Sequence, residues 1–283
     1  MSSNKLVLNQ GHQKISRTAE LGGSEYPPLG SRLFAVWYRH VRVYTRNIFS
    51  NGLPPFLEPL IFLVGIGIGL GTYISHMEGF SFIEYLASGL LVTTAMFTAA
   101  FECSFGTFIR LEYQKTYDGM LSAPITVNNL LVGEILWAGT KGFFFTMAVL
   151  LVISVFRIIP LGMSLLSPVI GFLTGTMFAT LSLLVTSFVK NINHFNFYFS
   201  GFISPMFFFS GVVFPVENLP LVVRPLSEVL PLTHAVRLTR VLCLGPEMSA
   251  GLWQIGFDVA YLILFTVIFG FWSIKRLKKR LVD

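Results

Sequence analysis

The amino-acid sequence predicts an all-α membrane protein with six transmembrane helices, an N-terminal amphipathic interfacial helix, and an external re-entrant helical hairpin between spans five and six. Two observations lead to this fold class. Hydrophobic residues make up 53% of the chain and charged residues only 12%, about half the charged fraction of soluble domains. The apolar residues also lie in runs that are long enough to cross about 30 Å of hydrocarbon as helices.

The apolar runs are expected to be helical, because backbone polar groups have no hydrogen-bond partner in lipid. They divide the chain into a polar tail over residues 1–30, an amphipathic helix over 31–50 and a six-span domain over 51–283. The six expected spans are Leu53–Ile74, Ile83–Ile109, Leu130–Phe156, Leu165–Val189, Phe195–Phe214 and Leu252–Ile274.

The segment Ser31–Phe49 is expected to be a helix that lies in the membrane interface. Apolar and aromatic residues recur in it at steps of three and four, and arginines follow the same period on another face. The apolar positions are Phe34, Trp37, Val41, Tyr44 and Ile48, and the arginines are Arg32, Arg39, Arg42 and Arg46. A solvated helix packed on soluble protein is the alternative, but the first span follows directly and favours the interface.

Lysine and arginine gather at both chain ends and in the link between the second and third spans, whereas the first two opposite loops hold few. By the positive-inside rule, both termini are expected to be cytoplasmic in a bacterial inner membrane. The net charge of +6 is then explained by anionic headgroups, and no nucleic-acid partner is expected. The connection before the last span breaks this pattern, because it holds Arg224, Arg237 and Arg240.

The link between the second and third spans, residues 110–129, is expected to contain a short amphipathic helix that docks into a groove of a partner protein. It mixes both signs of charge with aromatic and apolar side chains, and Pro124 ends any helix within it. The residues concerned are Arg110, Tyr113, Lys115, Tyr117, Asp118, Met120 and Leu121. A plain interfacial loop is the alternative, and the shorter link Lys190–His194 is a candidate for a second, smaller contact.

The connection Pro215–Gly245 is strongly apolar but is interrupted by prolines, which begin helices well and break their interiors. It therefore predicts two short helices, near Leu221–Leu230 and Leu232–Leu242, neither long enough to span. A re-entrant hairpin that enters from the outer side, with its arginines at the headgroups, explains this pattern. An ordinary external loop with two surface helices is the alternative.

The sequence shows no Gly-rich phosphate loop that ends in Gly-Lys-Ser/Thr, so no nucleotide site is expected in this chain. The five histidines lack metal-ligand spacing, and Cys103 and Cys243 are far apart, so neither a metal site nor a disulfide framework is expected. The chain is thus expected to be a non-catalytic protein without a cofactor of its own.

Two stretches of the sequence resemble the type-2 ABC export permeases. The first resembles the hallmark near the end of that family, at Ser210, Gly211, Pro215, Leu219, Pro220, Pro231, Leu232, Thr233, His234, Arg237 and Arg240. The second, Phe101–Trp137, is similar to the nodulation-factor export branch at Glu102, Arg110, Tyr117, Asp118, Pro124, Gly133 and Glu134. The resemblance covers roughly Arg32–Arg280.

The resemblance implies a homodimer of six-span subunits, or a pair with a paralogue, together with two cytoplasmic ATPase subunits that bind ATP and magnesium. It implies that the 110–129 link, with Glu134, contains the coupling helix seated on the ATPase, and that Ser31–Phe49 is the connecting helix beside it. Pro215–Gly245 would close the pathway from outside, through Pro215, Pro220, Pro231, His234, Arg237 and Arg240. The first and fifth spans would line the dimer seam, at Gly65, Gly67, Gly69, Phe199 and Phe202.

Ionisable residues inside the membrane are costly, so each needs a partner or water. Glu134 is expected to pair with Arg110 or a neighbouring link at the cytoplasmic edge. Glu102 and Lys141 either form a buried pair or line the pathway, and Asp258 is expected to make a structural pair or hydrogen bond.

The predicted function is export of an amphiphile, such as a lipid-linked saccharide or lipo-oligosaccharide, by alternating access driven by a separate ATPase. Drugs or other lipids are alternative substrates. A different class, a proton- or ion-coupled secondary transporter using Glu102 and Lys141, is disfavoured because no inverted repeat is visible. A membrane-embedded enzyme is disfavoured because no cluster has catalytic spacing.

Overall fold

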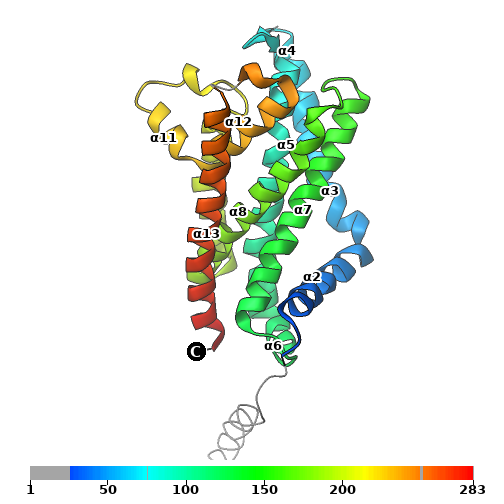
Figure 1. Cartoon of the computed structure of the whole chain (residues 1–283), viewed down its shortest axis with the longest axis vertical. Helices are drawn as coiled ribbons and strands as arrows, with labels where there is room; N and C mark the ends of the chain where they lie inside the picture. Colours follow the sequence, from blue (N-terminus) through cyan, green and yellow to red (C-terminus); the bar gives the residue numbers. More distant parts are fainter. Residues whose placement is uncertain (1–25, 75, 249–250, 283) are drawn as a thin grey trace, which may run out of the picture.

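The computed structural model describes residues 26–74, 76–248 and 251–282 (Figure 1). Residues 1–25 of the expected polar tail over residues 1–30 therefore lie outside the described residues. Long helices run along the molecule, and short ones close its two ends. At one end lie α6 (Thr116–Leu121) and the C-terminal end of α13 (Leu252–Val282). At the other end lie α11 (Arg224–Val229) and α12 (Pro231–Leu244).

Five helical segments among the described residues are long and apolar enough to cross a membrane. They correspond to the first, second, third, fourth and sixth expected spans. In chain order they are α3 (Ile48–Phe62) with η1 (Leu63–Ile68) and α4 (Gly69–Gly71), α5 (Phe82–Phe101) with η2 (Glu102–Gly106) and η3 (Ile109–Tyr113), α7 (Val127–Val155), η4 (Met163–Leu166) with α8 (Ser167–Phe188), and α13.

The expected fifth span, Phe195–Phe214, is not among these five segments, although its residues 195–209 form one continuous helical run. It consists of α9 (Phe195–Tyr198), the π-helical η6 (Phe199–Ile203) and α10 (Ser204–Phe209), which have 4, 5 and 6 residues. Pro205 has no backbone N–H to donate to the preceding turn, and Gly211 leaves the helical region with a φ of +80°. The backbone stays helical through Pro205 and leaves the helix only at Ser210 and Gly211. The helical run is therefore shorter than the expected span, and a sixth full span remains a prediction.

The remaining elements are short, apart from α2 (Leu29–Arg46), which matches the expected amphipathic helix in extent. The two short helices predicted between the fifth and sixth spans are present as α11 and α12, and their position in the membrane remains a prediction. The turn Glu78–Gly79, with both φ angles positive, closes a small antiparallel hairpin that the sequence reasoning missed. The smaller elements are β1 (His76–Met77), β2 (Phe80–Ser81), η5 (Ile192–His194), η7 (Val216–Asn218) and η8 (Pro246–Met248).

Capping residues explain where the two central helices begin. Ser81 and Glu84 form a capping box at the start of α5, and Thr126 and Asn129 form one at the start of α7. Each pair satisfies backbone N–H groups that the first turn of a helix leaves without partners. The start of α7 therefore has a fixed register, which sets the direction of the ionisable residues that follow along the helix.

Helices α7 and α8 pack closely against each other through small residues. A Cβ atom added to Gly142 would lie 2.5 Å from the carbonyl oxygen of Gly171, and one added to Gly171 would lie 2.3 Å from Thr146 Oγ1. No side chain fits at these two positions, so the helix backbones approach as closely as in small-residue membrane interfaces.

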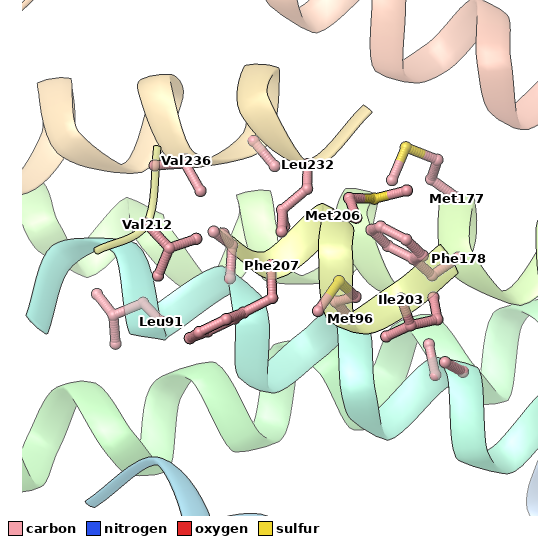
Figure 2. Close-up of a cluster of buried hydrophobic side chains, with 14 of the residues drawn as sticks. Leu91, Met96, Met177, Phe178, Ile203, Met206, Phe207, Val212, Leu232 and Val236 are labelled. Atoms are coloured by element: carbon pink, nitrogen blue, oxygen red, sulfur yellow. The ribbon is translucent and has the colours of Figure 1, made fainter. Parts of the chain in front are cut away.

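One part of the core lies where the end of the fifth segment meets α5 and α12. Figure 2 shows Phe207 of α10, with Val212 just after it, between Leu91 of α5 and Val236 of α12, while Met206 lies beside Met177 and Phe178 of α8. Close packing of this kind fixes helices that hydrophobicity alone would not position. The two cysteines, Cys103 and Cys243, are also buried, and both are free thiols.

Candidate functional site

A cavity of about 770 Å³ opens among α2, α3, α5, α7 and α10. Its wall is amphipathic. The apolar part includes Phe62, Phe97, Phe101, Phe207 and Phe208, and the polar part includes His40, Tyr44, Glu102, Arg110, Trp137 and Lys141. A space of this size with one apolar and one polar region suits a ligand that has both characters.

Four ionisable residues form a continuous chain of ion pairs at the polar end. Lys141 Nζ lies 2.8 Å from Glu102 Oε2, and Arg110 Nη1 lies 2.7 Å from Glu102 Oε1. Arg110 Nη2 then lies 2.8 Å from Glu134 Oε2. Two positive and two negative charges alternate, so each buried charge has a partner, as the low-dielectric interior requires.

Glu134 is the branching point of this charge chain and is fully buried. Its Oε1 accepts a hydrogen bond of 2.8 Å from the Tyr117 hydroxyl. His40 Nε2 lies 3.0 Å from the same oxygen, a contact that is an ion pair only when the imidazole is protonated. Burial, with the nearby Glu134 carboxylate, raises the pKa of Tyr117. The phenol therefore stays protonated and remains a donor.

The expected pairing of Glu134 with Arg110 is confirmed, and Glu102 and Lys141 both pair with each other and line the cavity. The sequence reasoning missed His40, which lies on the same helix stripe as Val36 and Tyr44 at steps of four. One nitrogen of His40 and one oxygen each of Glu102 and Glu134 all lie within 4.8 Å of one another. Arg110 and Lys141 already neutralise the two carboxylates, so this set is an ion-pair cluster and not an open cation site.

Helix α2 is attached to α7 by packing and two hydrogen bonds. Val36 lies against Gly133, where an added Cβ would come within 2.4 Å of its Cγ1. Arg32 Nη1 donates to Asn129 Oδ1 at 2.9 Å, and Trp37 Nε1 donates to Thr140 Oγ1 at 3.0 Å. Of the connecting-helix residues expected from the sequence, Arg32, Trp37 and Arg39 are thus partly covered.

The outer face of α2 carries exposed residues of two kinds. Arg42 and Arg46 are exposed, and so are the apolar side chains Phe34, Tyr38 and Val43. This mixture is compatible with the membrane interface, and the interfacial position of α2 remains a prediction. Tyr44 turns inward to the cavity, where burial and Glu102 raise its pKa to about 12.

The predicted docking residues of the 110–129 link divide into two groups. Tyr113, Lys115 and Asp118 are exposed and available to a partner. Tyr117 was expected to be an exposed anchor, but it is 1% exposed and packs with Val36, Leu111 and Leu130. Met120 and Leu121 are half-buried against this cluster. The reason is that the Tyr117 hydroxyl donates a hydrogen bond to Glu134. The side of α6 that carries Tyr117 therefore packs on α7, and the opposite side is exposed.

The residues predicted for the dimer seam are only partly covered in the single chain. Gly65 and Gly69 have open space where a side chain would project, whereas Gly67 lies against Ile83. Phe199 stacks on Phe101 with ring centroids 4.3 Å apart, and Phe202 is exposed. Their contact with a second subunit remains a prediction.

A second ion-pair cluster lies at the opposite end and joins α12 to α13. His234 Nδ1 lies 2.6 Å from Asp258 Oδ1, and Arg237 Nη1 lies 3.1 Å from the same oxygen. Arg237 also pairs with Glu228 at 2.8 Å. The structural role expected for Asp258 is confirmed.

The other arginines of this connection bind backbone carbonyls. Arg240 donates to the carbonyls of Gly211 and Val212 and stacks on the Tyr85 ring, and Arg224 donates to the carbonyl of Leu219. Local partners thus account for the arginines that break the positive-inside pattern. Of the prolines expected at the external gate, Pro231 begins α12 and Pro215 precedes η7, while Pro220 accepts turn hydrogen bonds from Val223 and Arg224.

Comparison with known proteins identifies the family. The family described as ABC-2 type transporter matches residues 31–244. Nodulation protein J of Rhizobium meliloti (strain 1021) is 33% identical over 258 residues, which cover 90% of this chain and 96% of that protein. Nodulation protein J of Rhizobium leguminosarum bv. trifolii is 34% identical over 88% of this chain and 93% of that protein.

A more distant relative is the inner membrane transport permease YadH of Escherichia coli (strain K12), 21% identical over 83% of this chain and 92% of that protein. The matched region includes α2, most of the long helices, the ion-pair chain and the α11–α12 connection. The chain belongs to the ABC-2 type transporter family and is a multi-pass inner-membrane permease.

Proposed function

We propose that this permease is the membrane-spanning subunit of an ATP-driven exporter, and that a separate cytoplasmic ATPase binds the ATP and magnesium and drives it through α6. The observation that carries the proposal is the attachment of α6. Tyr117 fixes its inner side to Glu134 of α7, while Tyr113 and Asp118 stay exposed. A short helix held rigidly on one side and open on the other can transmit a push from a partner.

The transport cycle is proposed to be alternating access. Closure of two ATPase subunits on ATP would move α6 in each of two permease subunits, and the long helices would exchange inward- and outward-open arrangements. Pairing with a second copy of the chain is supported by the uncovered faces at Gly65, Gly69 and Phe202. In this proposal both termini are cytoplasmic, with α6 on the same side.

The proposed substrate is an amphiphile. The cavity of about 770 Å³ has aromatic and polar parts, which suit an acyl chain and a polar head respectively. The resemblance to the nodulation-factor branch favours a lipid-linked saccharide or a lipo-oligosaccharide as the cargo. A drug or another lipid would use the same amphipathic wall, so the cargo must be identified by transport.

The test is co-purification followed by transport. The tagged permease is purified from its native membrane together with any subunits that accompany it, and nucleotide-dependent flux is measured in inside-out vesicles. We expect an ATPase to co-purify and Asp118→Lys to reduce its recovery, because the charge reversal falls on the exposed side of α6. Glu217→Lys is the matched control, since Glu217 is exposed at the opposite end. Transport by the permease alone, driven by a proton gradient, would instead favour the secondary transporter.

A further inference from the structure

The ion-pair chain extends from the cavity wall to the attachment point of α6. Glu102, Arg110 and Lys141 line the cavity, and so does His40. Glu134 and Tyr117 do not line it, yet they receive the other end of the chain and hold α6. The side chains that a cavity ligand would touch are therefore the direct partners of the side chains that fix the proposed ATPase seat.

The connection has no gap along its length. From Lys141 to Glu102, Arg110, Glu134 and Tyr117, the successive contacts are 2.8, 2.7, 2.8 and 2.8 Å. All five side chains are mostly or fully buried. In such an environment a displaced member leaves its neighbour with an unpaired charge, so the members move together or exchange partners as a unit.

The polar end of the cavity also offers atoms that a ligand could engage. Tyr44 Oη and Thr98 Oγ1 are buried and have no hydrogen-bond partner among the described residues. Both residues line the cavity beside Glu102, and Thr98 is only 4% exposed. A buried polar atom without a partner is unfavourable, so a hydroxyl-bearing head would be drawn to the start of the ion-pair chain.

We infer that occupancy of this cavity is transmitted to α6 through Glu102, Arg110, Glu134 and Tyr117, which are positioning residues for coupling and not contacts for the ATPase. This inference rests on the proposed function. A head group at Tyr44 and Thr98 changes the packing of Glu102 and Arg110, Arg110 changes its hold on Glu134, and Glu134 carries Tyr117 with it. Linkage then requires the reverse effect, in which the nucleotide state of the ATPase changes the affinity of the cavity.

The experiment uses the permease–ATPase complex in lipid nanodiscs, with radiolabelled octyl glucoside below its micelle concentration as the probe. The probe Kd is measured with and without a non-hydrolysable ATP analogue. In the wild-type complex we expect the analogue to change the Kd by about 5-fold or more, the usual range of allosteric coupling. In Tyr117→Phe and Glu134→Gln, which alter residues outside the cavity wall, we expect the change to fall below about 2-fold.

The matched control is Glu112→Gln. Glu112 lies two residues after Arg110 but pairs with Arg280 and Lys115, outside the chain and the cavity, so the wild-type ratio should be retained. Thr98→Phe, which fills the polar end, should abolish probe binding and shows where the probe binds.

The ratio of two affinities separates transmission from structural damage, because a variant that only destabilises the complex lowers its yield but not the ratio. A wild-type ratio in both Tyr117→Phe and Glu134→Gln would overturn the inference, and so would an insensitive wild type. If no ATPase assembles with the wild-type permease, the proposed function itself fails.

Discussion

The two ends of the molecule solve the same electrostatic problem in different ways. At the α6 end, the ion-pair chain joins η2 and η3 to α7 and reaches α6 only through side chains, with a cavity beside it. At the α12 end, arginine and histidine side chains bind carboxylates and also backbone carbonyls. His234 contacts the carbonyl of Glu228, and Arg240 donates to the carbonyl of Gly211. Backbone carbonyls are fixed by their own helices and turns, whereas side-chain partners can change rotamer. We therefore expect the contacts at the α12 end to stay fixed and those at the α6 end to be able to change.

The largest effect is expected from Arg110→Met, which leaves Glu102 with one partner fewer and Glu134 without its cation. Breaking a buried pair by removing one member costs about 3–5 kcal/mol. Thermal unfolding of the purified permease should show this loss, while the exposed Arg42→Met should change stability by less than about 0.5 kcal/mol. Equal stabilities of the two variants would show that the ion-pair chain at the α6 end does not stabilise the folded permease.

A smaller loss is expected from Asp258→Asn, which weakens the charge-assisted bonds to His234 and Arg237. Such bonds contribute about 1.5–3 kcal/mol. The same unfolding assay measures this loss of stability. Recovery of the co-purified ATPase should not change, because Asp258 lies at the opposite end of the molecule from α6. If Asp258→Asn releases the ATPase and Arg110→Met does not, the roles of the two ends are reversed.

The attachment of α2 gives the next effect. Gly133→Ala places a methyl group against Val36, where the space is already filled, and overpacking costs about 1–3 kcal/mol. Gly256→Ala on α13 is the control, because nothing lies within 4 Å of its added Cβ, and it should be neutral or slightly stabilising. A neutral Gly133→Ala would mean that α2 is not fixed against α7 at Val36, so the movable region would include α2.

The smallest effect is expected from Trp37→Phe, which keeps the aromatic ring but removes the hydrogen bond to Thr140. The loss should be about 0.5–1.5 kcal/mol, and it should appear in hydrogen exchange of α2 before it appears in global unfolding. If hydrogen-exchange protection of α2 is unchanged from wild type, the contacts of Val36 and Arg32 are sufficient to attach α2 to α7.

The sequence predicted the long helices well because apolar length is a direct requirement of the bilayer. It was less exact at Phe195–Phe214, where the continuous helical run ends at Phe209 and Gly211 takes a positive φ. The pair of Arg110 and Glu134 could be expected, since both residues stand at the same edge of neighbouring spans. The direction of Tyr117 could not, because it depends on a carboxylate 17 residues further along the chain, and no local pattern records that contact.

Both native cysteines are buried, and burial raises the pKa of Cys243 to about 11. The thiolate is the reactive form, so the native chain should react slowly with maleimides. A cysteine introduced at Tyr113, which is 65% exposed, would then be the preferred attachment point for a fluorophore or spin label. The permease is therefore suited to distance spectroscopy across its cycle without first removing its own thiols.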